Sequence, residues 1–167
     1  MDIEAIKRAK YAYFRCVDTA NLGELAELLD ENVTATFSGG SYSIKLDGRD
    51  AYVELIANST HSQLIVQHNG HHPEIDVLNE TEAVGTWYLS DFALDFRRKQ
   101  SITGAAFYRD KYRKKDGLWL LTHTAYERVF EIVGEIHERP NVTAHYLATH
   151  GRASPTAALD AVFKAAQ

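Results

Sequence analysis

The sequence predicts an α+β fold in which helices come first and a long antiparallel sheet follows. Helical spacing of apolar residues is confined to about the first 60 residues, whereas the chain after residue 63 consists of alternating, strand-like runs. These runs are joined by short turn-forming segments, among them residues 79–81, 97–100 and 114–117. Strands joined in this way must be antiparallel, and the separation of helices from strands is typical of α+β architecture.

Helices are expected in the first part of the chain. The first extends from about residue 2 to 19, because one face repeats at spacings of three and four residues: Ile3, Ile6, Lys10, Tyr13 and Val17. Asn21 and Glu24 have the spacing of a capping box, which predicts the start of a second helix. Residues 47–58 predict a third, short helix.

The strands are expected at residues 33–37, 42–46, 64–68, 74–79, 82–96, 101–114 and 118–131, with a turn across the histidine-rich segment 68–73. A sheet with helices on one face can curl around them and leave a pocket between the two layers. The pattern weakens from about residue 134. We therefore expect one domain over residues 1–133 and a C-terminal extension, residues 134–167, that is loose or covers the pocket or a subunit interface.

The composition is that of an ordinary globular domain, with 45% hydrophobic and 25% charged residues in a chain of 167. The N-terminus lacks the apolar segment of a signal peptide, and the single cysteine, Cys16, fits a reducing compartment. A net charge of −5 gives no sign of a nucleic-acid footprint, and no run is apolar enough to span a bilayer. We expect a cytoplasmic protein that binds neither nucleic acid nor membranes.

Three histidines lie within five residues, and this cluster suggests either a metal site or an acid–base site. Adjacent residues of a strand point to opposite faces, so His71 and His72 are not expected to share a metal. Neither a cysteine pair nor an HExxH helix accompanies them. No metal and no other cofactor is expected.

An acid–base site needs a histidine in a pocket and a partner for its ring. His68 ends the apolar strand face of Leu64 and Val66, and Asp91 ends another apolar strand face. A buried carboxylate must be paired or protonated, and a neighbouring imidazole would serve. Periodicity alone favours a satisfied core histidine at this position. The coincidence of the two polar residues leads us to expect His68 and Asp91 to be hydrogen-bonded.

Other polar residues are harder to interpret from spacing. Tyr13 lies on the apolar face of the first helix, where a phenol is usually core filler. Asp18 is about 140° around that helix from Tyr13, so it joins the same site only if the helix frays. Arg128 shares a strand face with Thr124 and Tyr126. A surface salt bridge would explain either Asp18 or Arg128.

Several blocks of the chain resemble one known family. The order of elements resembles the SnoaL-like branch of the nuclear-transport-factor-2 (NTF2) fold, a cone-shaped α+β barrel with N-terminal helices packed in a curved antiparallel sheet. The blocks at 2–18, 68–75, 85–91, 104–112 and 116–131 are similar to bacterial bile-acid 7α-dehydratases. This resemblance implies a catalytic set on five positions: Tyr13, Asp18, His68, Asp91 and Arg128.

The resemblance implies a cofactor-independent dehydratase that removes water from a hydroxylated polycyclic, steroid-like substrate. In that scheme His68 is the base, Asp91 holds its tautomer, and Tyr13 donates a hydrogen bond. Asp18 and Arg128 pair to shape the polar end of the site. The residues expected to contact substrate are Phe14, Phe37, Trp87, Phe107 and His71. The alternatives are an enzyme like ketosteroid isomerase or a polyketide cyclase, and a non-catalytic dioxygenase small subunit or binding module.

The expected partner is a small hydrophobic substrate, and the sequence leaves open whether it is bound as a coenzyme A thioester. Relatives with this architecture assemble through the outer face of the sheet, so we expect a homo-oligomer, with a trimer favoured over a dimer. Trp119, Leu121 and Val129 are expected to form an apolar row on the strand face opposite Arg128.

Overall fold

The computed structural model describes residues 1–40 and 42–153. The helices are α1 (Asp2–Thr19), α2 (Leu22–Leu28), α3 (Arg49–Ser59) and α4 (Leu147–His150). The strands are β1 (Leu29–Ser38), β2 (Ser43–Asp47), β3 (Leu64–Val77), β4 (Glu82–Asp95), β5 (Gln100–Lys115) and β6 (Leu118–Glu135). No helix in these ranges is long and apolar enough to cross a membrane.

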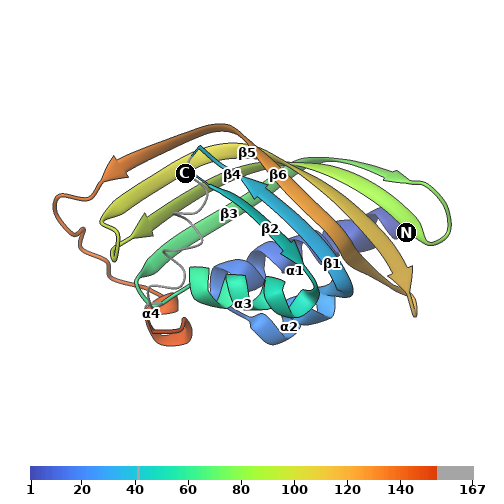
Figure 1. Ribbon diagram of the computed structural model, residues 1–167, viewed down its shortest axis with the longest axis horizontal. Coiled ribbons are helices and arrows are strands. Elements are labelled where there is room, and N and C mark those ends of the chain that lie inside the picture. Colours follow the sequence, from blue (N-terminus) through green and yellow to red (C-terminus); the bar gives the residue numbers. More distant parts are fainter. Residues whose placement is uncertain (41, 154–167) are drawn as a thin grey trace.

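The strands form one curved, unclosed sheet of six strands in the order β2-β1-β6-β5-β4-β3. Helices α1, α2 and α3 lie against its concave side, so the molecule has the form of an open cone (Figure 1). Neighbouring strands are antiparallel except β1 and β6, which pair in parallel. The α+β prediction is confirmed, and the parallel pairing of β1 with β6 is a feature that the turn pattern did not indicate.

The two N-terminal helices begin and end near the residues expected from the sequence. The predicted inner face of α1 is buried except at its first residue, Ile3, which is exposed. Helix α1 stops at Ala20, whose φ of 51° is left-handed. Helix α2 follows at once, because the Asn21 side chain accepts a hydrogen bond from the Glu24 backbone N–H at 3.4 Å.

The turn expected across the histidine-rich segment is absent, because β3 runs without interruption from Leu64 to Val77. Its register with β4 shifts between His71 and Glu74, and His72 has a φ of 48°. The segment is therefore a β-bulge, which re-aims side chains without ending the strand.

Two further register shifts occur in β6, at Thr122 and at Val129. An unpaired residue moves every later side chain to the opposite face. Trp119 and Leu121 consequently lie in the same interior as Thr124 and are only 4% exposed. The expected outer row of Trp119, Leu121 and Val129 is therefore wrong, and only Val129 is exposed.

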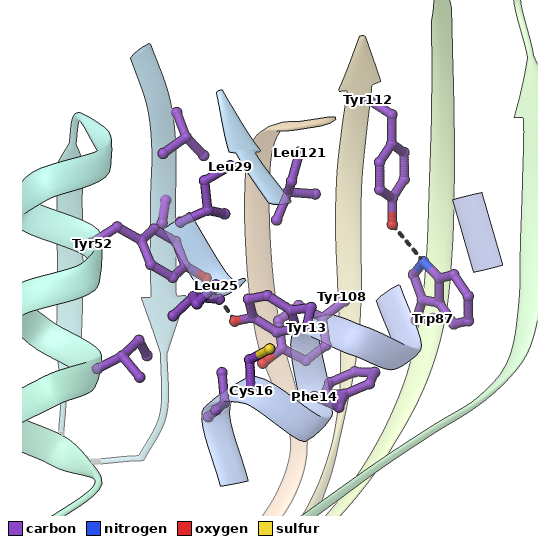
Figure 2. Packing of buried hydrophobic residues seen from close by; sticks show 14 of the residues in the cluster. Tyr13, Phe14, Cys16, Leu25, Leu29, Tyr52, Trp87, Tyr108, Tyr112 and Leu121 are labelled. Carbon is purple, nitrogen blue, oxygen red and sulfur yellow. Dashed lines mark hydrogen bonds between the residues drawn. The ribbon is translucent and has the colours of Figure 1, made fainter. Parts of the chain in front are cut away.

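A polar network lies within the core, and its Trp87–Tyr112 hydrogen bond is seen among the packed aromatic side chains of Figure 2. The Trp87 indole donates to the Tyr112 hydroxyl at 3.0 Å, and that hydroxyl donates to Asp110 at 2.7 Å. Thr124 donates to the other carboxylate oxygen of Asp110, Oδ1. The Lys10 ammonium lies 2.8 Å from Asp110 Oδ2, the oxygen that accepts from Tyr112. Both members of the Lys10–Asp110 pair are essentially inaccessible to water, so each depends on the other for charge compensation.

The extension beyond β6 packs back over the open end of the cone. His145 hydrogen-bonds to the Leu64 carbonyl at 2.9 Å, and Arg152 pairs with Glu54 of α3 at 2.9 Å. Leu147 of α4 is only 3% exposed. The extension was expected to be loose or covering, and its residues 154–167 lie outside the described part of the chain.

The Lys10→Met variant should lower the free energy of unfolding by about 3–5 kcal/mol, because it leaves the Asp110 carboxylate buried without a counter-charge. Urea denaturation followed by circular dichroism measures this difference. Lys7→Met is the matched control, since Lys7 lies on the same helix in an exposed pair with Glu4 and should change stability by less than about 0.5 kcal/mol. Equal stability of Lys10→Met and the wild type would contradict the argument.

Candidate active site

A cavity of about 520 Å³ lies between the concave face of the sheet and helices α1 and α3. Its walls are mostly apolar, with side chains from both layers: Val17, Ile44, Leu55, Ile56, Val66, Ile102 and Val133. Its polar lining includes Tyr13, His68, Asp91 and Arg128. An apolar cavity of this size with a few convergent polar groups is the usual form of a small-molecule site.

His68 is bound by the carboxylate of Asp18. The His68 ring Nδ1 lies 2.5 Å from Asp18 Oδ1, and the His68 backbone N–H donates to Asp18 Oδ2 at 3.0 Å. An ionised carboxylate only accepts hydrogen bonds, so Nδ1 carries the hydrogen and Nε2 is left as the acceptor of the neutral ring. No described residue hydrogen-bonds to Nε2, which makes His68 a candidate general base.

The aromatic ring of Phe14 supports the His68 ring from the side of α1. The two rings are nearly parallel, with an interplanar angle of 13° and centroids 6.3 Å apart. Phe14 can approach only because Gly70 follows two residues after His68, on the same strand face. A Cβ at Gly70 would lie 2.1 Å from the Phe14 ring. Gly70 is thus part of the site although it contributes no side chain.

Asp91 is bound by Arg128 rather than by His68. Arg128 donates Nη1–H to Asp91 Oδ1 at 2.6 Å and Nη2–H to Oδ2 at 2.8 Å, a bidentate ion pair. Burial disfavours the Arg128 charge, but the hydrogen bonds to Asp91, together with the electrostatic effects of Tyr42, Asp91 and Tyr126, outweigh burial and raise the pKa of Arg128. Gly104 lies between the strands that carry the pair, where a Cβ would be 2.9 Å from Nη1.

The expected pairs, His68 with Asp91 and Asp18 with Arg128, are therefore wrong, and the partners are exchanged. His68 and Asp91 are direct cross-strand neighbours, but both oxygens of Asp91 are engaged by Arg128. Asp18 lies inside α1 and contacts His68 from there, so the helix does not need to fray. The site therefore contains the ion pairs His68–Asp18 and Arg128–Asp91 in place of the expected pairs.

Tyr13 lies on the cavity wall with its hydroxyl 2.6 Å from that of Tyr52. Burial, followed by the neighbouring Tyr52, raises the pKa of Tyr13 well above its ordinary value. Tyr13 therefore stays protonated and can act as a hydrogen-bond donor. Tyr108 and Tyr126 extend this phenol-lined side of the cavity.

Of the residues expected to contact substrate, Phe37 alone lies among the cavity-lining residues. Phe14 lies behind His68, and Trp87 is fully buried in the core network. Phe107 and His71 lie on the outer face of the sheet, each packed against Tyr88. The His72 bulge also brings His71 and His72 to one side, with their Nδ1 atoms 2.7 Å apart, contrary to the opposite faces expected from alternation.

The described residues include no group of three or more His, Cys, Asp or Glu side chains placed to hold a metal ion. An imidazole fixed by a carboxylate, beside a protonated phenol, can supply a base and a hydrogen-bond donor in one apolar cavity.

Sequence reasoning missed several lining residues. Tyr42 alternates with Ile44 in the strand expected at 42–46, and this alternation could have indicated that both face the cavity. His61 lies in the loop after α3, where no periodicity indicates a direction. Glu131 faces the cavity only because of the Val129 bulge, since simple alternation with Arg128 would point it outward. A register shift of this kind leaves no mark in the hydrophobic pattern.

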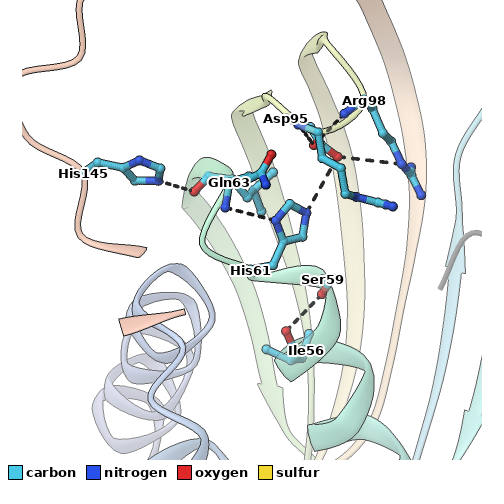
Figure 3. A network of polar contacts seen from close by, with 9 residues as sticks. Ile56, Ser59, His61, Gln63, Asp95, Arg98 and His145 are labelled. Atoms are coloured by element: carbon cyan, nitrogen blue, oxygen red, sulfur yellow. Dashed lines mark hydrogen bonds and ion pairs between the residues drawn. The ribbon is translucent and has the colours of Figure 1, made fainter. Parts of the chain in front are cut away.

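His61 belongs to a polar cluster at the mouth of the cavity (Figure 3). Its Nδ1 accepts the Gln63 backbone N–H at 3.2 Å, and its Nε2 lies 3.9 Å from Asp95. Burial, opposed by Asp95, lowers the pKa of His61, so the ring is neutral near pH 7. Arg98 Nε lies 3.8 Å from the same oxygen of Asp95, Oδ2, and Arg98 also borders the cavity.

Several solved structures share this fold. A protein provisionally named scytalone dehydratase, from Novosphingobium aromaticivorans DSM 12444, superposes with a TM-score of 0.70 at 22% identity, over 83% of this chain and 89% of its own. The hexachlorocyclohexane dehydrochlorinase LinA-type3 from Novosphingobium barchaimii LL02 gives 0.71 at 20% identity, over 83% and 94%. A protein of unknown function from Mycobacterium tuberculosis gives 0.66 at 17% identity, over 98% and 87%.

These likenesses, all at low identity, establish the fold, which is that of the nuclear-transport-factor-2 (NTF2) superfamily, a group that supports many activities. The family model of the SnoaL-like domain matches residues 1–125, which include four of the polar positions described above: Tyr13, Asp18, His68 and Asp91. The chain belongs to the SnoaL-like family.

Proposed function

We propose that this protein is a cofactor-independent lyase that eliminates water from a hydroxylated polycyclic substrate. The observation that carries the proposal is the His68–Asp18 pair, which leaves Nε2 of a neutral imidazole available in an apolar cavity. In this scheme Asp18 takes the orienting role that the sequence had suggested for Asp91.

Elimination requires a proton to be removed from carbon and a hydroxide to leave. In a 3-oxo-4-ene steroid the conjugated ketone makes the C6 proton acidic, so the reaction needs neither a Lewis acid nor a redox step. His68 Nε2 takes that proton, the electron pair moves into the dienolate, and the C7–O bond then breaks. Asp18 stabilises the imidazolium, which returns its proton to the departing hydroxide, and water leaves.

Tyr13 is the proposed donor to the substrate oxygen on which charge develops. Its raised pKa keeps the phenol protonated throughout the reaction, and a donor of this kind in a dry site stabilises the dienolate. Asp91 and Arg128 are proposed to form the polar wall beside the base. Because both oxygens of Asp91 accept hydrogen bonds from Arg128, Asp91 is not free to serve as the base.

The fold neighbours support an elimination chemistry. One carries the name of a dehydratase and another that of a dehydrochlorinase, which removes hydrogen chloride rather than water. The steroid-like substrate is what the resemblance to bile-acid 7α-dehydratases implies, and the apolar walls and a volume within the roughly 300–1,000 Å³ typical of small-molecule sites are compatible with it. A ketosteroid isomerase would use a carboxylate base, and a binding module would need no oriented histidine. The proposed substrate class includes both the free steroid and its coenzyme A thioester.

The His68→Ala variant should reduce turnover of 7-hydroxylated 3-oxo-4-ene steroids by at least about 10²-fold with little change in KM, because a base acts mainly in the transition state. The absorbance of the extended dienone measures the rate. Asp18→Asn should also slow turnover, and the double variant should be little worse than the worse single one.

His71→Ala is the matched control, since this histidine lies three residues away on the outer face and should leave the rate unchanged. Circular dichroism must first show that each variant is folded. A folded His68→Ala protein that eliminates water at the wild-type rate would sink the mechanism.

Elimination should be insensitive to chelators, because the acidity of the C6 proton comes from the conjugated ketone. The rate is compared before and after dialysis against EDTA, with metal content followed by elemental analysis. Loss of activity together with one bound metal per chain, restored when that metal is returned, would contradict the proposed mechanism.

We also propose that the protein assembles through the outer face of the sheet. Exposed apolar side chains cross β4, β5 and β6 there: Phe92, Phe107, Val129, Phe130 and Ile132. Such a surface is rarely left in water. Light scattering should give a mass near three times 18.8 kDa, and Phe130→Asp should lower it. A wild-type monomer at micromolar concentration would contradict the proposal, whereas a dimer would overturn only the stoichiometry.

A further inference from the structure

The polar wall of the cavity holds more negative charge than the catalytic scheme uses. The Arg128 guanidinium lies between two carboxylates, with Asp91 on its Nη atoms and Glu131 Oε2 at 3.2 Å from its Nε. The side chains of all three residues are only 10–11% exposed. One cation therefore faces two anions in a nearly dry place, where an excess charge is costly unless a donor or a proton compensates it.

Glu131 is the under-compensated member of this group. Its Oε2 and the Arg128 Nε are buried and close, yet neither makes a hydrogen bond of acceptable geometry. Its Oε1 has no hydrogen-bond donor among the described residues. By contrast, both oxygens of Asp91 receive good hydrogen bonds from Arg128. Acceptor capacity therefore remains on Glu131, whose side chain lines the cavity.

Within the described part of the chain, the other cationic groups near the cavity are engaged away from Glu131. If His68 becomes protonated, its charge is matched by Asp18, with which it is in direct contact. Arg98 lies beside Asp95, and Arg97, which also lines the cavity, has interaction partners other than Glu131. The adjoining side chains of Tyr42 and Tyr126 are phenols that contact each other. The hydrogen-bond donor that Glu131 lacks is therefore one that a ligand can supply.

We infer that Glu131 is a specificity-determining residue that binds a hydroxyl group of the substrate, one that is not eliminated. The hydroxyl donates to Glu131, and a hydrogen bond to a charged acceptor is about twice as strong as one between neutral groups. The same wall repels a carboxylate, although an arginine in a pocket would ordinarily suggest an anion site. The inference rests on the proposal that this cavity binds a polycyclic alcohol. It adds that the substrate has a second hydroxyl, at the end that lies beside Glu131.

Binding, rather than turnover, tests this inference. The probes are 3-oxo-4-ene steroids of one skeleton without a C7 hydroxyl: the parent, its hydroxyl derivatives at C12 or C17, and its 17β-carboxylic acid. Isothermal titration should show at least one hydroxylated steroid binding the wild type about tenfold more tightly than the parent, and the acid more weakly than the parent. A wild-type protein that binds alcohol and parent alike overturns the inference.

Two variants at position 131 separate recognition from structure. In Glu131→Ala the advantage of the hydroxyl should fall below about threefold, while the acid should gain about tenfold because one negative charge is gone. Glu131→Gln, which preserves the shape, should show the same gain for the acid and a partial loss for the alcohol. Glu135→Gln is the matched control, since Glu135 is exposed on the same strand and should change neither affinity.

A merely structural role for Glu131 would weaken all the ligands together, and that result would overturn the inference. His68→Ala should abolish elimination yet keep the preference for the hydroxyl. If the wild type shows that preference but never eliminates water, the dehydratase proposal fails and the role of Glu131 stands. Elimination without any hydroxyl preference would overturn the role of Glu131 and leave the dehydratase proposal standing.

Discussion

An extra residue in a β-strand reverses the direction of every side chain that follows it, and this constraint sets the content of the cavity. Strand β6 crosses the whole cone, and it contains two such residues, Thr122 and Val129. The first places Trp119 and Leu121 in the core while Arg128 still faces inward. The second turns Glu131 inward beside Arg128. The curvature that makes a cavity and the polar wall that equips it thus have the same origin.

The two ion pairs of the cavity join different parts of the fold. His68 and Asp18 join the sheet to the end of α1, whereas Asp91 and Arg128 join β4 to β6 within the sheet. Each pair satisfies the charges of its own members, so neither depends on the other for compensation. Gly70 and Gly104 provide the space for these contacts, and their missing side chains belong to the site as much as the charged ones.

Much of this could be predicted from the sequence, for reasons that are physical. Alternation along 64–68 and 85–91 placed His68 and Asp91 on inner faces, and the helix period placed Tyr13 and Lys10 on the buried side of α1. The pairing could not be predicted in the same way, because periodicity gives the direction of a side chain and not its partner. Asp18 contacts His68 because α1 packs along β3, and this packing belongs to the tertiary structure, which periodicity does not reveal. The side chain of Glu131 and the close approach of His71 to His72 depend on bulges, which hydrophobic patterning does not record.

Helix α1 carries Asp18 in its last turn, and this position has an electrostatic consequence of its own. The unpaired carbonyl groups at a helix C-terminus carry the negative end of the helix dipole, and no basic residue in that turn of α1 offsets it. His68 is held at this end by hydrogen bonds to the Asp18 carboxylate. A positive charge that forms on the imidazole ring is therefore favoured by the helix as a whole as well as by its nearest neighbour. The backbone of α1 thus contributes a field to the site in addition to the side chains of Tyr13, Phe14, Val17 and Asp18.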